Sequence, residues 1–126
     1  MKHSIQLIVL GDLFAICRLA NDAPVPPWAS RGFTSITRTA DELSIVCPQS
    51  HVPDGVQSER DWRCLQIAGK LAFSMVGILA SLLTPLAEAG ISVFVVSTFA
   101  TDYVLVKQTD LEKALSALDA AGHAIQ

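Results

Sequence analysis

The chain is poor in charge, and above all in basic residues. Only 17% of its 126 residues are charged, with nine Lys and Arg against twelve Asp and Glu and a formal net charge of −3. Nucleic-acid-binding surfaces need a concentration of positive charge, and anionic membranes are bound by runs of Lys and Arg. The sequence has neither feature, so we expect no nucleic-acid partner and no membrane partner.

Residues that commonly hold metals or perform catalysis are also few. The three histidines are far apart and the three cysteines have no metal-like spacing: His3, His51, His123, Cys17, Cys47 and Cys64. There is no phosphate-binding loop, dinucleotide-binding fingerprint or nucleophile elbow. A Cys47–His51 pair is conceivable, but Pro48 and a flexible loop give it no fixed geometry, which favours a buried cysteine and a solvated histidine. We expect no metal, no cofactor and no enzyme.

The longest uncharged stretch, residues 71–87, invites comparison with a membrane span. Pro85 and Gly90 interrupt it, and no basic flank would fix its orientation. Its large side chains fall on one helical face, which predicts a buried amphipathic helix: Val76, Leu79, Leu83 and Leu86.

Location is expected to be cytoplasmic. The first residues, MKHSIQLIVLGDL, have a short apolar run and no small-residue cleavage site, so we do not expect a signal peptide. The cysteines lie in strand-like runs, where a small buried hydrophobe in a reducing compartment is the usual role.

Apolar alternation and turn residues predict the order of the elements. In the N-terminal half we expect four strands, one helical turn after a proline pair, and a linker or mobile loop: residues 5–10, 13–18, 33–38 and 42–47, then 26–30 and 49–59. In the C-terminal half we expect a strand, a helix, two strands joined by a turn at residues 98–101, a helix and a short last strand: residues 62–68, 75–89, 91–97, 102–107, up to 120, and 124–125.

Three details of the C-terminal half are also predicted. Pro85 should kink or weaken the first helix near Ser81. Residues 91–97 are continuously apolar, which predicts a strand buried on both faces. Thr109 and Glu112 have the spacing of a capping box for the last helix.

The two halves look like a weak internal repeat, in which the first copy has a shortened helix. We therefore expect an α/β fold, an α+β sandwich of two unequal ferredoxin-like βαββαβ units with antiparallel sheets. The expected domains are a divergent, shortened unit at residues 1–60 and a fuller one at residues 61–126.

Two motifs in the C-terminal half identify a family. One is Met75-Val76-Gly77-Ile78-Leu79, and the other is Ala89-Gly90-Ile91-Ser92-Val93 leading to Ser97-Thr98-Phe99 and to Asp102-Tyr103-Val104-Leu105-Val106. Residues 61–120 thereby resemble the ACT domain, the amino-acid-sensing module of metabolic enzymes. The similarity is to the variant shared by aspartate kinases, the arginine-sensing CASTOR family and small free-standing bacterial proteins.

The resemblance implies a ligand site. In that family the sheets of two units pair side by side, and an amino acid binds in the crevice between units. Its walls are the strand-to-helix loop of one unit and the strand edge and turn of the other. By motif, these map to Ser74, Met75, Val76, Gly77, Ile78, Thr98, Phe99, Thr101 and Asp102.

Elementary chemistry is compatible with such a site. A helix beginning near Gly77 offers free backbone N–H groups to a carboxylate, and Gly77 lets a ligand approach closely. Asp102 can accept from an ammonium or guanidinium group, and Phe99 can cover a ligand chain. The alternatives stay open: Gly77 packs the helix closely on the sheet, Asp102 is a turn residue, and Phe99 belongs to a core or an interface.

We therefore expect an amino-acid-binding regulatory ACT-domain protein. Because 51% of the residues are hydrophobic, a second face hidden in a homodimer is expected. The first rival is an oligomerisation module without a ligand. The second is a small enzyme that uses the same crevice, which would need an acid–base partner for Asp102.

Overall fold

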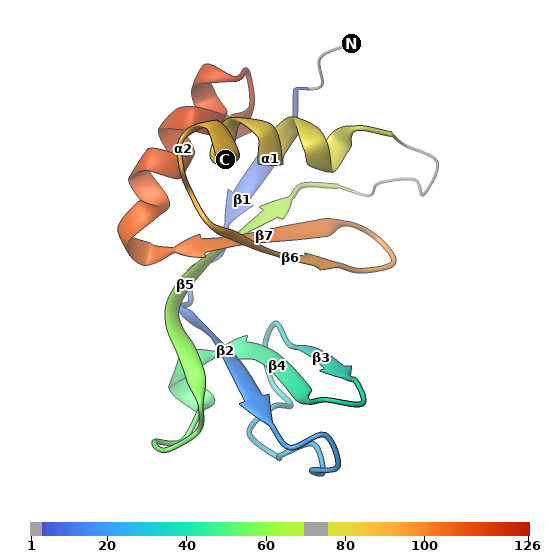
Figure 1. Cartoon of the computed structure of the whole chain (residues 1–126). Helices are drawn as coiled ribbons and strands as arrows, with labels where there is room; N and C mark the ends of the chain where they lie inside the picture. The colour runs from blue at the N-terminus through green and yellow to red at the C-terminus, as the bar shows by residue number, and fades with distance from the viewer. Residues whose placement is uncertain (1–3, 70–75) are drawn as a thin grey trace. The chain divides into compact units, whose positions relative to one another are not determined.

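The computed structural model of the chain describes residues 4–69 and 76–126, which pack as two units (Figure 1). Unit 1 comprises residues 1–11 and 63–126, and unit 2 comprises residues 12–62. Strand β5 (Ser58–Ile67) passes through the boundary. The packing boundary lies close to residue 60 but groups the N-terminal strand with unit 1. The expected division into two ACT-like domains stays a prediction.

Unit 1 contains a mixed sheet and two α-helices. In the described residues its strands lie in the order β8-β1-β5-β7-β6, with β1 antiparallel to β5 and parallel to β8. From β5 onward the elements follow the expected βαββαβ order, and β1 is inserted between the first and last strands of that plan. The bounds are β1 (Gln6–Val9), α1 (Ile78–Glu88), β6 (Val93–Ser97), β7 (Asp102–Lys107), the 3₁₀ turn η2 (Gln108–Asp110), α2 (Leu111–Ala120) and β8 (Ala124–Ile125).

The two helices lie on one face of this sheet (Figure 1), and each buries an apolar stripe against it. The stripe of α1 is not the predicted one: Ile78, Leu82 and Leu86 are buried, whereas Leu79 and Leu83 are half-buried and Val76 is exposed. Leu82 and Leu86 of α1 and Leu118 of α2 are each 1% exposed. Burial of a leucine contributes roughly 2–3 kcal/mol of hydrophobic stabilisation. The strands complete this core with Leu7, Leu65, Ile67, Val104 and Val106. No helix among the described residues is long and apolar enough to cross a membrane.

Several boundaries in unit 1 are confirmed and others are corrected. Strands β7 and β8 have the predicted bounds. The first helix begins at Ile78 rather than near Met75, because Gly77 has a φ of +81°, which a right-handed helix does not contain. The capping box is wrong: α2 continues from a 3₁₀ turn, and no side-chain hydrogen bond caps it.

The expectation that residues 91–97 form a strand buried on both faces is also wrong. Within the described residues β6 pairs with β7 alone, so it is an edge strand. Val96 is buried, whereas Val93, Phe94 and Val95 are half-buried. An apolar run therefore marked an edge of the sheet instead of its centre.

Helix α1 runs through Pro85 without a break. Proline has no N–H, so the carbonyl oxygen of Ser81 loses its helical hydrogen bond. His123, which is 3% exposed, replaces it: its Nε2 lies 2.9 Å from the Ser81 oxygen, and its Nδ1 accepts from the Ile5 N–H at 3.1 Å. A carbonyl oxygen only accepts, so the ring proton is on Nε2. The weakened turn predicted near Ser81 is thus compensated from the other end of the chain.

Unit 2 is a sheet without an α-helix, and all of its residues are described. Its strands lie in the order β3-β4-β2-β5, and β2 pairs antiparallel with both β4 and β5. One face buries a small core that includes Ala15, Leu43 and Ile45. The predicted helical turn at residues 26–30 is a hydrogen-bonded turn. The bounds are β2 (Phe14–Leu19), β3 (Ser35–Arg38), β4 (Leu43–Pro48) and the 3₁₀ turn η1 (Gln49–His51).

The linker expected at residues 49–59 is instead tied to the sheet. Strand β5 begins at Ser58, four residues before the predicted start, although its first residues are polar. Asp61 interrupts the strand with a φ of +66°, and the register with β2 shifts there. The Gln49 side chain stabilises this bulge, because its Oε1 accepts from the Asp61 N–H at 2.7 Å and its Nε2 donates to Asp61 Oδ1 at 3.0 Å.

The three cysteines are buried free thiols. A hydrogen bond between the thiols of Cys17 and Cys47 lowers the pKa of Cys17 and raises the pKa of Cys47. His51 is an exposed residue of η1. These contacts support the buried cysteine over a Cys47–His51 pair.

Stability should fall at alkaline pH because of Cys64. Burial raises the pKa of its thiol from 9.0 to about 12. Between these values the unfolded chain has lost this proton and the folded chain has kept it, so the contribution is complete below pH 9 and declines toward pH 12. We expect the stability advantage of the wild type over Cys64→Ala to shrink by about 1 kcal/mol between pH 8 and 10. Urea unfolding under reducing conditions measures both proteins, and an unchanged difference would contradict the expectation.

Candidate functional site

The site predicted from the sequence draws on two parts of unit 1, the start of α1 and the β6–β7 turn. Both lie at the same end of unit 1 (Figure 1). Ser74 and Met75 lie outside the described residues. Val76 and Gly77 are exposed, and Ile78 is buried as the first residue of α1.

The start of α1 has backbone donors to offer. Gly77 is the N-cap, and its carbonyl accepts the first helical hydrogen bond, from the Ser81 N–H at 3.0 Å. Within the described residues, no side-chain hydrogen bond caps this end. The N–H groups of the first helical turn have no intrahelical partner, and the positive end of the helix dipole lies there. The Gly77 Cα carries no side chain to cover these donors, so a carboxylate is the group that this end would bind best.

The β6–β7 turn is held by its threonines. Thr98 donates through its backbone N–H and through Oγ1 to the Thr101 carbonyl, at 2.9 and 3.1 Å. Thr101 is 6% exposed, and its Oγ1 donates to the Ile67 carbonyl at 3.1 Å, which ties the turn to the end of β5. The two hydroxyls therefore support the turn.

Phe99 and Asp102 are the turn residues best positioned for a ligand. Phe99 is 83% exposed at the tip of the hairpin. Asp102 is half-buried at the start of β7. Within the described residues, no hydrogen bond or ion pair engages the Asp102 carboxylate. It is free to accept from a ligand ammonium group.

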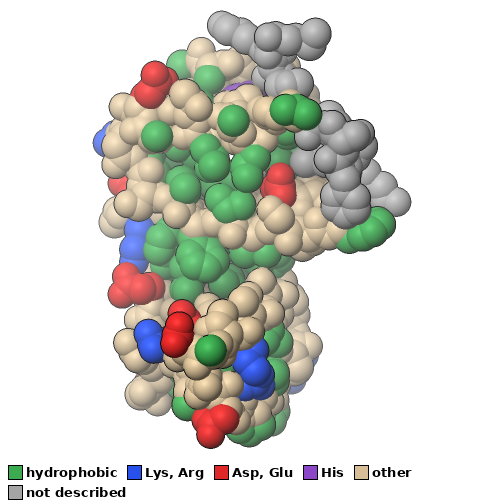
Figure 2. All heavy atoms as spheres, turned by 45° about the vertical axis from the view of Figure 1, so that its right-hand side comes forward, with side chains coloured by type: hydrophobic (Ala, Val, Ile, Leu, Met, Phe, Trp, Pro, Cys, Tyr) green, Lys and Arg blue, Asp and Glu red, His purple; other side chains and the backbone are tan. Residues whose placement is uncertain are grey.

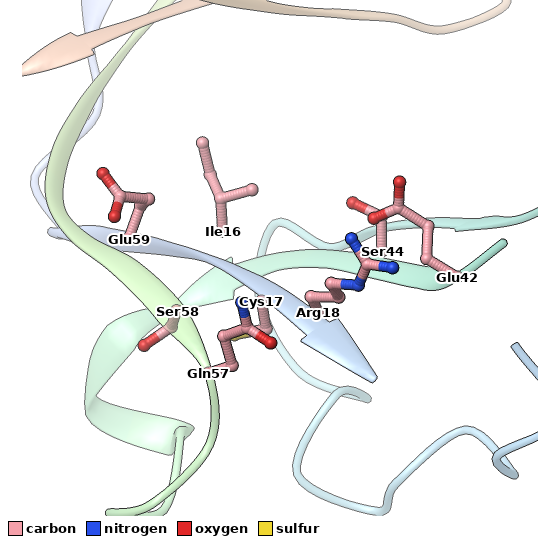
Figure 3. Close-up of a pocket in the computed structure, with 8 residues that line it drawn as sticks. All are labelled: Ile16, Cys17, Arg18, Glu42, Ser44, Gln57, Ser58 and Glu59. Carbon is pink, nitrogen blue, oxygen red and sulfur yellow. The ribbon is translucent and has the colours of Figure 1, made fainter. Parts of the chain in front are cut away.

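Sequence reasoning missed a depression in unit 2. It is open, has a volume of about 200 Å³ and lies on the sheet of β2, β4 and β5 (Figure 3). It is lined by Ile16, Cys17, Arg18, Glu42, Ser44, Gln57, Ser58 and Glu59.

The pairing of the strands explains why this depression escaped detection. Arg18 lies opposite Ser44, and Ile16 lies opposite Glu59. These residues are distant in sequence and form no motif. The one available signal was the Ile16–Arg18 alternation, which places an arginine on the non-core face of a strand.

Family models match both parts of the chain. The model of the ACT domain matches residues 57–120, and the model of an N-terminal domain family matches residues 12–55. A human protein described as putative protein CASTOR3P is 33% identical over 92 residues, or 63% of this chain. The chain spans 56% of the length of that relative.

Solved structures share the fold. A crystal structure of a protein from Agrobacterium tumefaciens is 43% identical with a TM-score of 0.93, over 98% of this chain and 93% of that one. The regulatory subunit of aspartate kinase from Thermus flavus is 12% identical with a TM-score of 0.66, over 94% and 99%. Aspartate kinase from Clostridium acetobutylicum, described as an allosteric enzyme, is 14% identical with a TM-score of 0.69, over 96% and 35%. These likenesses confirm the expected α+β fold of ferredoxin-like regulatory domains.

Proposed function

The chain belongs to the ACT domain family, whose model matches residues 57–120, and from this premise we propose that it is a regulatory module that binds an amino acid. The observation that supports this most directly is the presence of two complementary groups at one end of unit 1 (Figure 1). The start of α1, which no described side chain caps, offers donors for the α-carboxylate, and the Asp102 carboxylate can accept from the α-ammonium group. Phe99 would cover the ligand.

A regulatory role fits better than a catalytic one. General acid–base catalysis needs two positioned titratable groups, and the proposed site has Asp102 as its carboxylate. One similar structure is a regulatory subunit of aspartate kinase, and that name describes that protein. We propose the same class of role here, without an enzyme activity. The buried free thiols of all three cysteines support a reducing, cytoplasmic location as part of the proposal.

We also propose that the chain forms a homodimer through β6. Figure 2 shows hydrophobic side chains gathered on the face of unit 1 where α1 and β6 lie in Figure 1. The half-buried apolar residues of these elements include Leu79, Leu83, Val93, Phe94 and Val95. An apolar edge strand is a template for pairing with another chain. Strand β3 of unit 2 also forms an edge, but its Arg38 is an exposed charge that discourages pairing.

A screen of the twenty amino acids by thermal unfolding tests the ligand proposal. At least one should raise the Tm by several degrees, because a ligand at about 100 times its Kd stabilises the folded state by about 2.7 kcal/mol. Asp102→Asn should weaken the binding of that amino acid about tenfold or more, because the substitution removes the charged acceptor.

Asp12→Asn is the matched control. Asp12 is an exposed aspartate beside a turn in unit 2, and it belongs neither to the proposed site in unit 1 nor to the lining of the depression in unit 2. Its substitution should leave the ligand-induced rise in Tm unchanged. If none of the twenty amino acids stabilises the protein, the ligand proposal fails. A dimer whose stability ignores all of them would instead favour an oligomerisation module.

A further inference from the structure

We propose that the depression on unit 2 is a second binding site, for a small dipolar ion that has a carboxylate and an ammonium group. Its eight lining residues all belong to unit 2, so it shares no residue with the site proposed in unit 1. They come from strands β2, β4 and β5 and from the residues just before two of these strands, Glu42 before β4 and Gln57 before β5. Nothing in the amino-acid site of unit 1 is needed for this second site.

Most of the side chains that line the depression lie on the face of the sheet opposite the core, and Cys17 and Ser58 complete the lining from the strands themselves. Ala15 and Cys17 of β2 are buried in the core of unit 2, and successive side chains of a strand point to opposite faces. Ile16 and Arg18 therefore point away from that core. Figure 3 shows Arg18, Ser44 and Glu42 gathered on one side of Ile16 and Glu59 on its other side. An apolar floor is thus bordered by groups of both charges.

Arg18 and Glu42 can still form hydrogen bonds with a ligand. Arg18 is exposed, and within the described part of the chain its side chain donates one hydrogen bond, from Nη2 to the Asp41 carbonyl at a long 3.3 Å. A guanidinium has five N–H donors, so most of them are available. Glu42 is half-buried, and within the described residues its carboxylate takes part in no hydrogen bond or ion pair. Ser44 adds a hydroxyl beside the two charges.

This combination selects against ligands of a single charge. A simple anion would be attracted by Arg18 but repelled by the carboxylates of Glu42 and Glu59. A simple cation would be attracted by these carboxylates but repelled by Arg18. A dipolar ion satisfies both: its carboxylate accepts from Arg18 and Ser44, and its ammonium donates to a glutamate. A volume of about 200 Å³ equals about seven waters, which suits a molecule of fewer than ten non-hydrogen atoms. A short apolar group would rest on Ile16.

Three matched probes test the proposal on the full-length, ¹⁵N-labelled protein by NMR. L-valine has both charges, isovalerate lacks the ammonium, and isobutylamine lacks the carboxylate. Up to about 20 mM valine should shift the amide signals of Ile16, Ser44 and Ser58 in a saturable way, as expected for millimolar binding at an open site. Isovalerate and isobutylamine should each bind at least about fivefold more weakly, because each leaves one charge of the site without a partner.

Variants separate this site from the site in unit 1. Arg18→Gln and Glu42→Gln should each raise the Kd for valine, measured from the unit 2 amide signals, about fivefold or more. Lys113→Gln and Glu112→Gln make the same charge changes on exposed positions of α2 and should have no effect there. Dispersed spectra report that each variant is folded. Asp102→Asn should leave the unit 2 signals responsive, since it belongs to the other site.

Three results would overturn the proposal: no saturable shift in unit 2, equal responses to all three probes, or unchanged valine binding in Arg18→Gln. Shifts confined to residues around Gly77 and Asp102 would support the unit 1 ligand and overturn the second site. Shifts confined to unit 2 would support the second site, while the amino-acid screen decides the fate of the first. The failure of one proposal is thereby distinguishable from the failure of the other.

Discussion

Replacement of His123 by alanine should lower the free energy of unfolding by about 2–4 kcal/mol, although His123 lies only three residues before Gln126. The ring accepts from the Ile5 N–H and donates to the Ser81 carbonyl, and it is 3% exposed. Its loss leaves a donor and an acceptor without partners in the interior of unit 1. Each unsatisfied buried group costs about 1–3 kcal/mol. Urea unfolding measures the change.

His51→Ala is the control for His123→Ala. His51 is exposed in η1, so its substitution should change stability by less than about 0.5 kcal/mol. If the two substitutions change the free energy of unfolding equally, the His123 hydrogen bonds make no net contribution to stability.

A double-mutant cycle with Pro85 identifies the mechanism. Pro85→Ala restores the N–H that bonds the Ser81 carbonyl in a regular helix, so His123→Ala should then cost about 1 kcal/mol less than it does beside Pro85. Additive effects would mean that His123 acts through Ile5 or through packing alone. The cycle thus tests whether the histidine compensates for the proline.

Val95→Pro should convert the proposed homodimer into a monomer. Thr98 and Thr101 form the hydrogen-bonded pair that closes the β6–β7 hairpin, because the Thr98 N–H donates to the Thr101 carbonyl. Hydrogen-bonded and non-hydrogen-bonded pairs alternate along an antiparallel ladder, so the Val95–Val104 pair is of the non-bonded kind. The Val95 N–H and carbonyl therefore point away from β7, toward the edge where a second copy would pair. Proline removes that donor and leaves the hairpin ladder intact.

Sedimentation equilibrium measures the outcome. The wild type should have twice the 13.5 kDa mass of the chain, and Val95→Pro should have the single mass at the same concentration. Val95→Ala shortens the side chain but keeps the N–H, so it should remain dimeric. If Val95→Pro also remains dimeric, the interface lies elsewhere. A monomeric wild type would remove the homodimer proposal.

Much of unit 1 was predictable because its signals are local. The Asp102–Lys107 strand, the body of α1 and the last strand follow from side-chain periodicity and from the residues at their ends. The family motifs also indicated Asp102 and the turn before it, which are still the strongest part of the proposed ligand site. The start of α1 was predicted too early, since a positive φ at Gly77 leaves no periodic signal.

Other features depended on residues that meet only in the folded chain. A polar run from Ser58 joins β5 because β2 pairs with it, and Gln49 holds the bulge at Asp61. The depression in unit 2 needed the register that sets Arg18 against Ser44. Such register depends on long-range packing, so no window of the sequence contains it.

The scarcity of charge, the order of the elements and the ACT motifs were determined by the sequence alone, because each depends on composition or on neighbouring residues. The tertiary structure decided that the apolar run of β6 is an edge, that His123 serves the turn weakened by Pro85, and that unit 2 has a depression bordered by both charges. These depend on which backbone groups remain unpaired once distant segments have met. Hydrogen bonding of that kind is settled by the whole fold.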